Sequence, residues 1–566
     1  MQKRVFVVGI LFGVAAVTLV GRLFFWQVIK ARELSASARL QYEGGSRIHA
    51  SRGSIKASDG TWLAASVESW LVYVAKNEME DSPEEVAETL SAVLYTEEER
   101  ENKKIEIENI LSDTDSVWVP IKHKVSTDVK KNIEAMGVDG VGFEREEDRF
   151  YPEASSSAHL VGFVGKDDEG MDKGYFGLEG YYDLTLTGNP GFLQGEFDAS
   201  GAPIAFGEVK EVTASNGVDL ITHIDKRVQF LVEEKLKNGL EAYGASSGMV
   251  IVMDPGDGGI MAAASFPSFD PKNYFEYGDE FFRNPIVSDA FEPGSVFKPI
   301  VMASALDIGA VEPDTVCDVC GGPVKVDKYT IETWDKKYYP DSTMTDVIVH
   351  SDNVGMTFVG QRLGAEKLYD YLVAFGFGEV TGIDLQGESR AKIREKKDWS
   401  YVDVATATFG QGIAVTPIQL IKAFSVIAND GVAVSPQVVD KIAISGWERD
   451  VEPEIGGQVI SKEAADEITK MMVYAAEKGE AKWTAVKGFG VAGKTGTAQI
   501  PIAGHYDDEK TIASFVGFAP YDRPKFVMLV SLREPQSSQW ASETAAPLWY
   551  SIANELFPYF SIQPKY

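Results

Sequence analysis

Two pairs of short apolar runs, far apart along the chain, constrain the fold more than any other feature. Residues 249–253 and 260–264 flank a stretch rich in Asp, Pro and Gly, and residues 512–518 and 525–532 flank a second turn. This pattern predicts two antiparallel hairpins. Helical runs lie between them, beginning with an amphipathic helix at residues 225–243. We therefore expect an α+β domain in which an antiparallel sheet is assembled from distant segments and flanked by helices.

The region before this domain has a different sequence pattern. Residues 31–215 alternate short strand-like runs with polar turns, include one charged helical stretch near residues 83–109, and carry no catalytic pattern. The Gly and Pro residues between these runs favour turns. We expect the region to form an elongated mixed α/β spacer. We divide the chain into residues 1–30, a pedestal at 31–215 and a catalytic domain at 216–566.

The expected cellular location of the chain follows from its first 30 residues. Lys3 and Arg4 precede an uncharged apolar run at residues 5–20, and residues 23–29 continue it beyond Arg22. About 20 to 25 such residues can cross a bilayer as a helix, with Arg22 reaching toward an interface. Basic residues before the span place the N-terminus in the cytoplasm. We expect a single-pass anchor in the cytoplasmic membrane, with the rest of the chain outside.

A cleaved signal peptide is the alternative to an anchor. The triplet at residues 36–38, Ala-Ser-Ala, has the small-x-small form that a signal peptidase accepts. It lies far beyond an apolar stretch that is too long for a signal peptide, so the uncleaved anchor is preferred.

Charge and residue counts exclude several functions. The net charge is -31, from 85 acidic and 54 basic residues, and nucleic acid needs clustered Lys and Arg, so none is expected as a partner. Six scattered histidines lack the spacing of a catalytic zinc site or a Ser-His-Asp triad. We therefore expect neither a metal nor a cofactor.

The only two cysteines are Cys317 and Cys320. No βαβ pattern supports a redox motif, and no further ligands support zinc. A local disulfide, which an extracytoplasmic setting favours, and an idle thiol pair both remain open.

Three short motifs occur in order: Ser-x-x-Lys at Ser295, Ser-x-Asn at Ser351 and Lys-Thr-Gly at Lys494. Each alone fits a helix cap, a turn or a strand end, and a second Ser-x-x-Lys occurs at Ser389 by chance. Ser-x-Asn and Lys-Thr-Gly each occur once. The order and uniqueness of the three motifs therefore favour a shared site.

The motif chemistry suits a serine nucleophile. A serine attacks a carbonyl only when a base takes its proton, and a neutral lysine is such a base. Three-residue spacing on a helix places Lys298 on the same face as Ser295, which we expect to begin a buried helix. Pro299 is tolerated in that first turn. In one cleft, Lys298 and Lys494 would each disfavour the other's charge, which shifts at least one of them toward the neutral form.

These motifs resemble those of the penicillin-binding protein and serine β-lactamase superfamily. The likeness extends over most of the chain and is closest to class B penicillin-binding proteins of the septal, cell-division branch. It is carried by residues 52–55, 60–64, 149–152, 177–180, 409–412 with 416–417, and 513–518. One departure is that Ala57 and Ser58 stand where the family usually has an Asp-Arg pair.

The resemblance implies a peptidoglycan D,D-transpeptidase that acts on stem peptides ending in D-Ala-D-Ala and is trapped by β-lactams. Ser295 would attack, Lys298 would act as base, and Ser351 would relay a proton to the leaving D-Ala. The backbone N–H groups of Ser295 and Thr497 would form the oxyanion hole. The remaining implied site residues hold the substrate and its carboxylate: Asn353, Lys494, Thr495, Gly496 and Thr497.

Other functions share the same motifs. A D,D-carboxypeptidase or β-lactamase hands the acyl group to water, but the pedestal and anchor favour transpeptidation. A β-lactam sensor needs several membrane spans, and an inactive scaffold would lose part of the motif set. No glycosyltransferase domain is expected, so the resemblance implies a membrane glycan polymerase and division proteins as partners.

Overall fold

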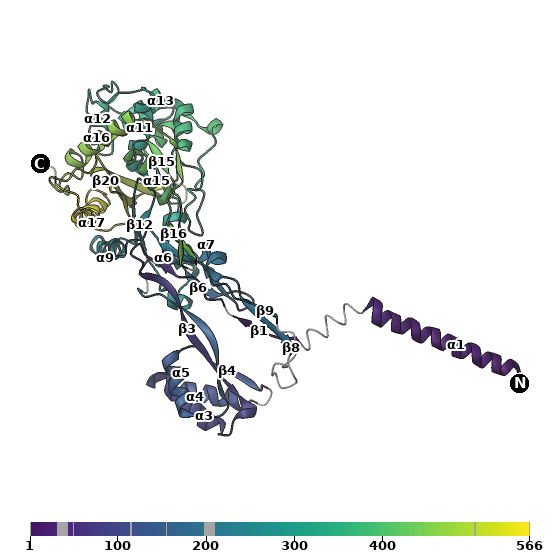
Figure 1. Cartoon of the computed structure of the whole chain (residues 1–566). Coiled ribbons are helices and arrows are strands. Elements are labelled where there is room, and N and C mark those ends of the chain that lie inside the picture. Colours follow the sequence, from purple (N-terminus) through teal and green to yellow (C-terminus); the bar gives the residue numbers. More distant parts are fainter. Residues whose placement is uncertain are drawn as a thin grey trace. The chain divides into compact units, whose positions relative to one another are not determined.

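The computed structural model describes residues 2–30, 43–48, 50–113, 116–153, 156–196, 210–444, 446–502 and 505–564. The chain forms two compact units, one made of Met1–Arg52 with Thr187–Gly217 and one of Gly53–Leu186 with Val218–Tyr566. The second unit contains both of the larger sheets and the predicted site. Figure 1 labels strands of both sheets, among them β20 and β3.

A five-stranded sheet forms the centre of the second unit. Its order is β12-β11-β21-β20-β19, and every neighbouring pair is antiparallel. Both predicted hairpins are confirmed, because β11 pairs with β12 and β20 with β21. The pairing of β11 with β21 joins the hairpins, so the sheet is assembled from distant segments as expected. The bounds are β11 Ser247–Met253, β12 Ile260–Phe266, β19 Ala492–Ile502, β20 His505–Ala519 and β21 Phe526–Arg533.

Successive side chains of this sheet alternate between two cores. Val250 and Val252 of β11 belong to one core, whereas Ile251 and Met253 belong to the other. Consecutive side chains on a strand point to opposite faces, so burial of both faces explains the unbroken apolar runs in the sequence.

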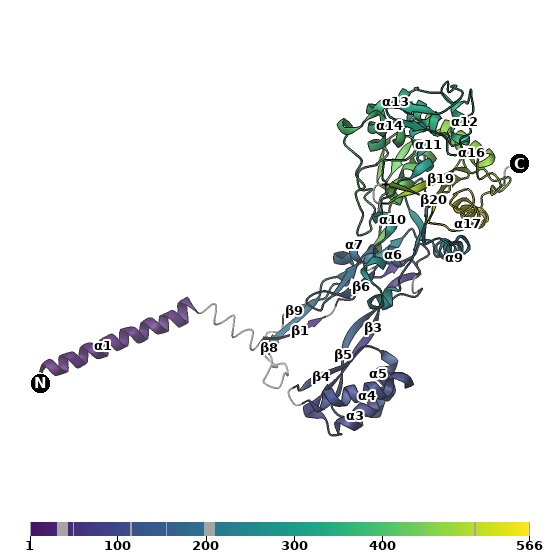
Figure 2. The ribbon, with the colours of Figure 1, turned by 180° about the vertical axis from the view of Figure 1, so that it is seen from behind.

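Helices cover both faces of the sheet. The helices α9 and α17 pack on one face, and α9 confirms the helix predicted from its apolar period. The helices α11, α13, α15 and α16 build the larger core on the other face. Three of them, α11, α13 and α16, are labelled in Figure 2. Their bounds are α9 Lys226–Tyr243, α11 Lys298–Asp307, α13 Asn353–Ala374, α15 Pro417–Ala428, α16 Lys462–Lys478 and α17 Ala545–Tyr559.

A second sheet has the order β17-β16-β10-β2-β3-β4, with β5 also paired to β3. Three helices, α3, α4 and α5, share a small separate core with β3 and β4. The strands are β2 Ile55–Lys56, β3 Trp62–Ala75, β4 Trp118–Ser126, β5 Val141–Phe150, β10 Asp219–Thr222, β16 Val439–Ile444 and β17 Trp447–Asp450. Ala57, one of the two positions that depart from the family pattern, is fully buried at the end of β2.

The charged stretch at residues 83–109, predicted as one helical stretch, is two helices. They are α3 (Pro83–Leu94) and α4 (Glu97–Ser112), with α5 (Thr127–Met136) following. Tyr95 is extended, and the Thr96 hydroxyl and Glu99 carboxylate form a capping box at the start of α4. This box satisfies N–H groups that a continuous helix would bond to its own carbonyls, so the break is encoded locally.

A buried ion pair joins two of the segments that carried the family resemblance. Arg149 Nε donates to Glu179 Oε1 at 2.6 Å, with the two side chains only 5% and 0% exposed. Arg149 Nη1 also donates to the carbonyl oxygen of Gly53, at 2.8 Å. The three segments, distant in sequence, therefore meet in one contact.

Shorter elements connect these layers. They are α6 Ala158–Val161, β6 Phe163–Lys166, β7 Asp172–Tyr175, α7 Gly177–Tyr181, α8 Asp183–Thr187, α10 Pro285–Ser288, β13 Val324–Val326, β14 Tyr329–Ile331, α14 Tyr401–Ala407, β15 Val432–Val434 and β18 Ile455–Gln458.

The first unit contains a helix and a small sheet. The helix α1 (Gln2–Phe24) continues into one π-helical turn (Phe25–Ile29), and the antiparallel sheet has the order β1-β8-β9. Those strands are β1 Glu43–Ile48, β8 Gly191–Glu196 and β9 Lys210–Val212. Over the residues that the structure describes, no helix meets the length and apolarity needed to cross a membrane. Apart from Met1, the predicted anchor lies within these residues, in α1 and the π-helical turn, whereas the alternative cleavage site at residues 36–38 lies wholly outside them.

Candidate active site

Ser295 lies in a short turn at the start of a buried helix. The turn is the 3₁₀ helix η5 (Gly294–Phe297), and α11 follows it. The sequence predicted that Ser295 begins the helix, but the α-helix proper begins at Lys298, with Pro299 in its first turn as expected. Lys298 is fully buried, whereas the Ser295 side chain is partly exposed.

Two glycines allow other segments to approach this turn. Gly410 has a φ of 78°, and a Cβ there would lie 2.2 Å from the carbonyl oxygen of Gly294. A Cβ at Gly496 on β19 would lie 2.8 Å from the backbone nitrogen of Val296. Only a residue without a side chain permits such approaches. The loop around Gly410 and the strand β19 therefore pack directly against η5.

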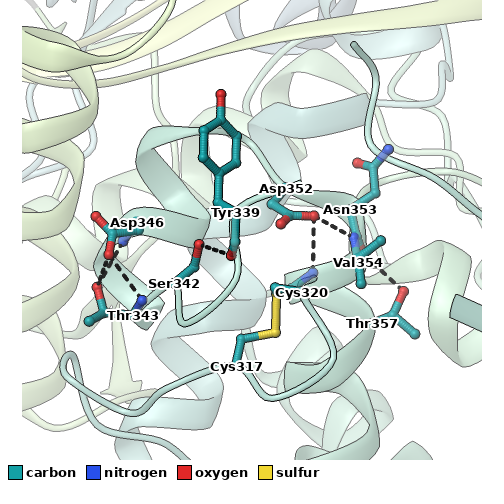
Figure 3. Close-up of a disulfide and its surroundings, with 11 residues drawn as sticks. Cys317, Cys320, Tyr339, Ser342, Thr343, Asp346, Asp352, Asn353, Val354 and Thr357 are labelled. Atoms are coloured by element: carbon teal, nitrogen blue, oxygen red, sulfur yellow. Dashed lines mark hydrogen bonds between the residues drawn. A yellow bond between two sulfur atoms is a disulfide. The ribbon is translucent and has the colours of Figure 1, made fainter. Parts of the chain in front are cut away.

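Ser351 forms the corner between α12 (Met344–Val349) and α13. Its φ is 55°, a left-handed conformation that non-glycine residues adopt at a cost. The next residue, Asp352, caps α13, because its carboxylate accepts hydrogen bonds from two backbone N–H groups of that helix at 2.8 and 3.2 Å (Figure 3). Asn353 is the first residue of α13. The Ser-x-Asn triplet is thus fixed by a helix cap.

Two lysines meet at the Ser351 hydroxyl. Lys298 Nζ lies 3.1 Å from Ser351 Oγ and 2.8 Å from Asn353 Oδ1, and it also donates to the Ser351 carbonyl oxygen. Lys494 Nζ lies 3.0 Å from the same hydroxyl oxygen and 3.1 Å from the carbonyl oxygen of Thr495. Lys494 is 3% exposed, so both amines are buried. The structure brings the three motifs together at one oxygen atom.

Burial and repulsion act on the two amines. Burial holds the pKa of Lys298 well below its ordinary value, and the charge of Lys494 lowers it further. The carboxylates of Asp352 and Glu480 have the opposite effect and raise it. Burial also lowers the pKa of Lys494, and the carboxylate of Glu480 opposes this effect. Burial therefore disfavours the charged form of both amines, and the carboxylate of Glu480 opposes this effect at each.

The other predicted site residues lie on β19. The Thr495 hydroxyl lies 3.3 Å from Lys494 Nζ, and the Thr497 hydroxyl accepts a hydrogen bond from the Ala541 N–H at 3.0 Å. The second Ser-x-x-Lys differs, because residues 389–392 belong to no helix and Lys392 is exposed. The structure thus groups the predicted site residues and leaves the chance motif outside.

A cavity of about 290 Å³ opens beside Ser295. Two aromatic side chains, Trp334 and Trp540, border it with their ring centroids 5.1 Å apart. Among the described residues, the Ser295 hydroxyl makes no hydrogen bond, so it is available to a ligand in this cavity. The lining residues are Gly294, Ser295, Trp334, Asn353, Phe409, Gln411, Thr497, Gln499, Thr511, Gln539 and Trp540.

Cys317 and Cys320 form a disulfide, which settles the alternatives that the sequence left open. Both are buried, and the Cys317 N–H donates to the Ser342 carbonyl oxygen at 2.8 Å. The disulfide lies in the segment between α11 and α12, near the Asp352 cap (Figure 3). The same segment carries Trp334, so it forms part of the cavity wall.

Sequence reasoning did not single out several residues at the site, among them Trp334, Trp540 and Glu480. Trp334 and Trp540 line the cavity, and Glu480 accepts a hydrogen bond from the Thr495 hydroxyl at 3.2 Å. None belongs to a motif. The available signal was a tryptophan within a polar stretch, as in residues 332–337.

Comparison with known proteins gives the family. The model "Penicillin binding protein transpeptidase domain" matches residues 248–556, and "Penicillin-binding Protein dimerisation domain" matches residues 47–222. The first match covers more than half of the chain and contains every predicted site residue.

Individual relatives match along nearly the whole length. The chain is 32% identical to "Stage V sporulation protein D" of Bacillus subtilis, with 100% of this chain and 87% of that protein covered. It is 28% identical to "Peptidoglycan D,D-transpeptidase FtsI" of Escherichia coli, with 96% and 90% covered.

A solved structure, penicillin binding protein 3 of Mycobacterium tuberculosis complexed with aztreonam, matches with a TM-score of 0.71 and 26% identity, covering 92% of this chain and 98% of that one. The transpeptidase domain, the dimerisation-type pedestal and these relatives agree with one another. The chain therefore belongs to the class B penicillin-binding proteins and is a serine-type peptidoglycan D,D-transpeptidase.

Proposed function

We propose that Ser295 is the nucleophile of this transpeptidase and carries the stem peptide as an acyl-enzyme. Its hydroxyl oxygen attacks the carbonyl carbon of the penultimate D-Ala, and Lys298 takes the hydroxyl proton. The bond to the terminal D-Ala then breaks, and Ser351 passes a proton to the leaving amine. An amine of a second stem peptide attacks the ester, which frees Ser295 and completes the cross-link.

One observation carries this proposal. The Ser351 hydroxyl lies within hydrogen-bonding distance of both Lys298 Nζ and Lys494 Nζ, at 3.1 and 3.0 Å, behind a cavity that Ser295 lines. Lys298 follows Ser295 by one helical turn, which suits transfer of a proton between them. Burial lowers the pKa of Lys298, which favours the neutral amine that a base requires.

The remaining residues bind the substrate. Asn353 holds the Lys298 amine through its Oδ1 and offers its amide group to the peptide. Lys494, Thr495 and Thr497 bind the terminal carboxylate, and the peptide lies along β19. The N–H groups of Ser295 and Thr497 stabilise the oxyanion, with a typical effect of about 10²- to 10³-fold for each donor.

Labelling by a fluorescent penicillin tests the nucleophile. A β-lactam carbonyl presents the same target as the peptide, so wild-type protein should form a stable adduct whose mass adds one β-lactam. Mapping should place the adduct on the peptide that contains Ser295, and Ser295→Ala should remain unlabelled. Labelling of the Ser295→Ala variant at another residue would overturn the proposal.

A second assay separates cross-linking from hydrolysis. A D-Ala-D-Ala stem peptide is supplied with an added amine acceptor, and the products are identified by mass. We expect peptide joined to the acceptor to dominate over free acid. Rapid hydrolysis of penicillin, or free acid as the only product, would favour a β-lactamase or a D,D-carboxypeptidase.

We further propose the three-part organisation of the full chain. Residues 1–30 anchor it in the cytoplasmic membrane with the N-terminus inside, residues 31–215 form the pedestal, and residues 216–566 form the transpeptidase domain. The uncharged apolar run at residues 5–20 supports the anchor. Membrane fractionation of full-length protein and of a variant lacking residues 1–30 tests it, because only the full chain should sediment with membranes.

The setting that we propose is septal wall synthesis, beside a membrane glycan polymerase and division proteins. The resemblance at residues 409–412 and 513–518 supports this branch. The similarity to a sporulation protein favours wall synthesis during sporulation as a second setting. Depletion of the protein in growing cells separates these two settings. Filamentation would indicate a division role, and a defect confined to spores would indicate a role in sporulation.

A further inference from the structure

Glu480 lies immediately beyond a helix that packs against the site. The helix α16 ends at Lys478, and Gly479 turns the chain, with its N–H donating to the Ala475 carbonyl oxygen at 3.0 Å. Gly479 also fits closely, because a Cβ there would lie 2.4 Å from that same oxygen. The turn thus gives Glu480 a defined position, partly buried, beside β19.

A chain of hydrogen bonds links the Glu480 carboxylate to the reaction centre. Thr495 Oγ1 donates to Glu480 Oε2 at 3.2 Å, and Lys494 Nζ lies 3.3 Å from Thr495 Oγ1. Lys494 Nζ then reaches Ser351 Oγ at 3.0 Å. Among the described residues, no direct ion pair joins Glu480 to a lysine, so the Thr495 hydroxyl is the bridge.

The charges around this bridge come from several elements. Lys298 lies on α11, Lys494 on β19 and Asp352 at the cap of α13, and Glu480 follows α16. On its own segment Glu480 is flanked by Lys478 and Lys482, which are exposed. The Glu480 carboxylate raises the pKa of both buried amines, and the Asp352 carboxylate raises the pKa of Lys298.

We propose that Glu480 is a positioning residue for acyl transfer, which orients Lys494 through the Thr495 hydroxyl and serves as the counter-ion of the buried lysine pair. This inference rests on the proposed roles of Ser295, Lys298 and Lys494. It adds a residue that lies outside the three motifs.

The direction of its effect follows from the sign of the charge. Acylation needs Lys298 neutral, so the rate rises as pH increases through the pKa of Lys298, and it needs Lys494 charged, so the rate falls at higher pH. The negative charge of Glu480 raises the pKa of both lysines. Its removal lowers both, so both limbs of the pH profile move to lower pH, by on the order of one pH unit.

The test measures the second-order rate constant of labelling by a fluorescent penicillin against pH in the full chain. Glu480→Gln and Glu480→Ala share only the loss of charge, so both should shift the profile to lower pH. Glu480→Asp keeps the charge and should keep the wild-type position. Glu477→Gln is the matched control, because this exposed residue on α16 carries the same charge, whereas the Thr495 hydroxyl donates to Glu480.

Two results would overturn the inference. One is a Glu480→Gln profile that superimposes on the wild-type profile, and the other is an equal shift in Glu477→Gln. If Glu480 had a purely structural role, its loss would lower the labelled fraction at every pH without moving the limbs of the pH profile. This outcome would also contradict the positioning role. Ser295→Ala is measured in parallel, because labelling of that variant defeats the proposed nucleophile independently of Glu480.

Discussion

Gly496 and Val296 touch backbone to backbone, since a Cβ at Gly496 would lie 2.8 Å from the Val296 nitrogen. This contact sets β19 against η5, and Ser295 and Thr497 both line the cavity in which we propose the oxyanion hole. We predict that Gly496→Ala lowers the acylation rate by about 100-fold or more, because the strand must move away from the turn. Stopped-flow labelling measures this rate.

The matched control is Gly457→Ala. A Cβ at Gly457 meets nothing within 4 Å, so this variant should label at the wild-type rate. If Gly496→Ala labels as fast as Gly457→Ala, the close approach has no role in catalysis.

Lys298→Arg separates a base from a mere positive charge. An arginine stays protonated at every working pH, so it keeps the charge but cannot accept the Ser295 proton. We expect labelling to slow by about 10²- to 10⁴-fold, with the circular dichroism spectrum unchanged. Acylation by the wild type should persist at neutral pH and fall on acidification, since burial lowers the pKa of Lys298. A rate within tenfold of wild type in Lys298→Arg would point to another base.

Ser351 offers a test that separates strain from chemistry. Its φ of 55° suits glycine better than any residue with a Cβ. Ser351→Gly should therefore be more stable than Ser351→Ala by about 1 kcal/mol in urea unfolding. Both variants remove the hydroxyl that the two lysines share, so both should label at strongly reduced rates. Equal stability of the two variants would show that the left-handed turn relaxes when the hydroxyl is lost.

The buried pair of Arg149 and Glu179 should matter for folding. Glu179→Gln leaves a guanidinium with 5% exposure facing an uncharged partner, so we expect a loss of about 3–5 kcal/mol in the free energy of unfolding. Chemical denaturation of the purified protein measures it. Arg100→Ala breaks an exposed pair with Glu88 and should leave the unfolding midpoint unchanged. Similar losses in both variants would contradict this account.

Local patterns predicted those parts of the fold that local physics determines. The hairpins of the central sheet and the helix α9 followed from apolar periodicity, and each lies where the sequence placed it. The break between α3 and α4 was missed because the apolar and charged pattern runs through it, although the capping box at Thr96 was visible in the sequence.

The candidate site likewise contains residues that the sequence predicted and residues that it did not. Motif spacing identified residues such as Lys298 and Lys494, but the shared Ser351 oxygen depends on strand pairing and on a helix cap that spacing cannot specify. Glu480 and Trp540 approach the site only through packing of distant segments. Their positions therefore required the three-dimensional arrangement.

The central sheet also sets the order in which the enzyme can mature. The strands β11 and β12 are synthesised long before β19, β20 and β21, yet the edge that carries Lys494 belongs to the late group. A chain still emerging from the ribosome thus has Ser295 without Lys494 and without the strand β19. The site is complete only when the last part of the polypeptide has been synthesised. An unfinished molecule is therefore protected from premature acylation by substrate or antibiotic.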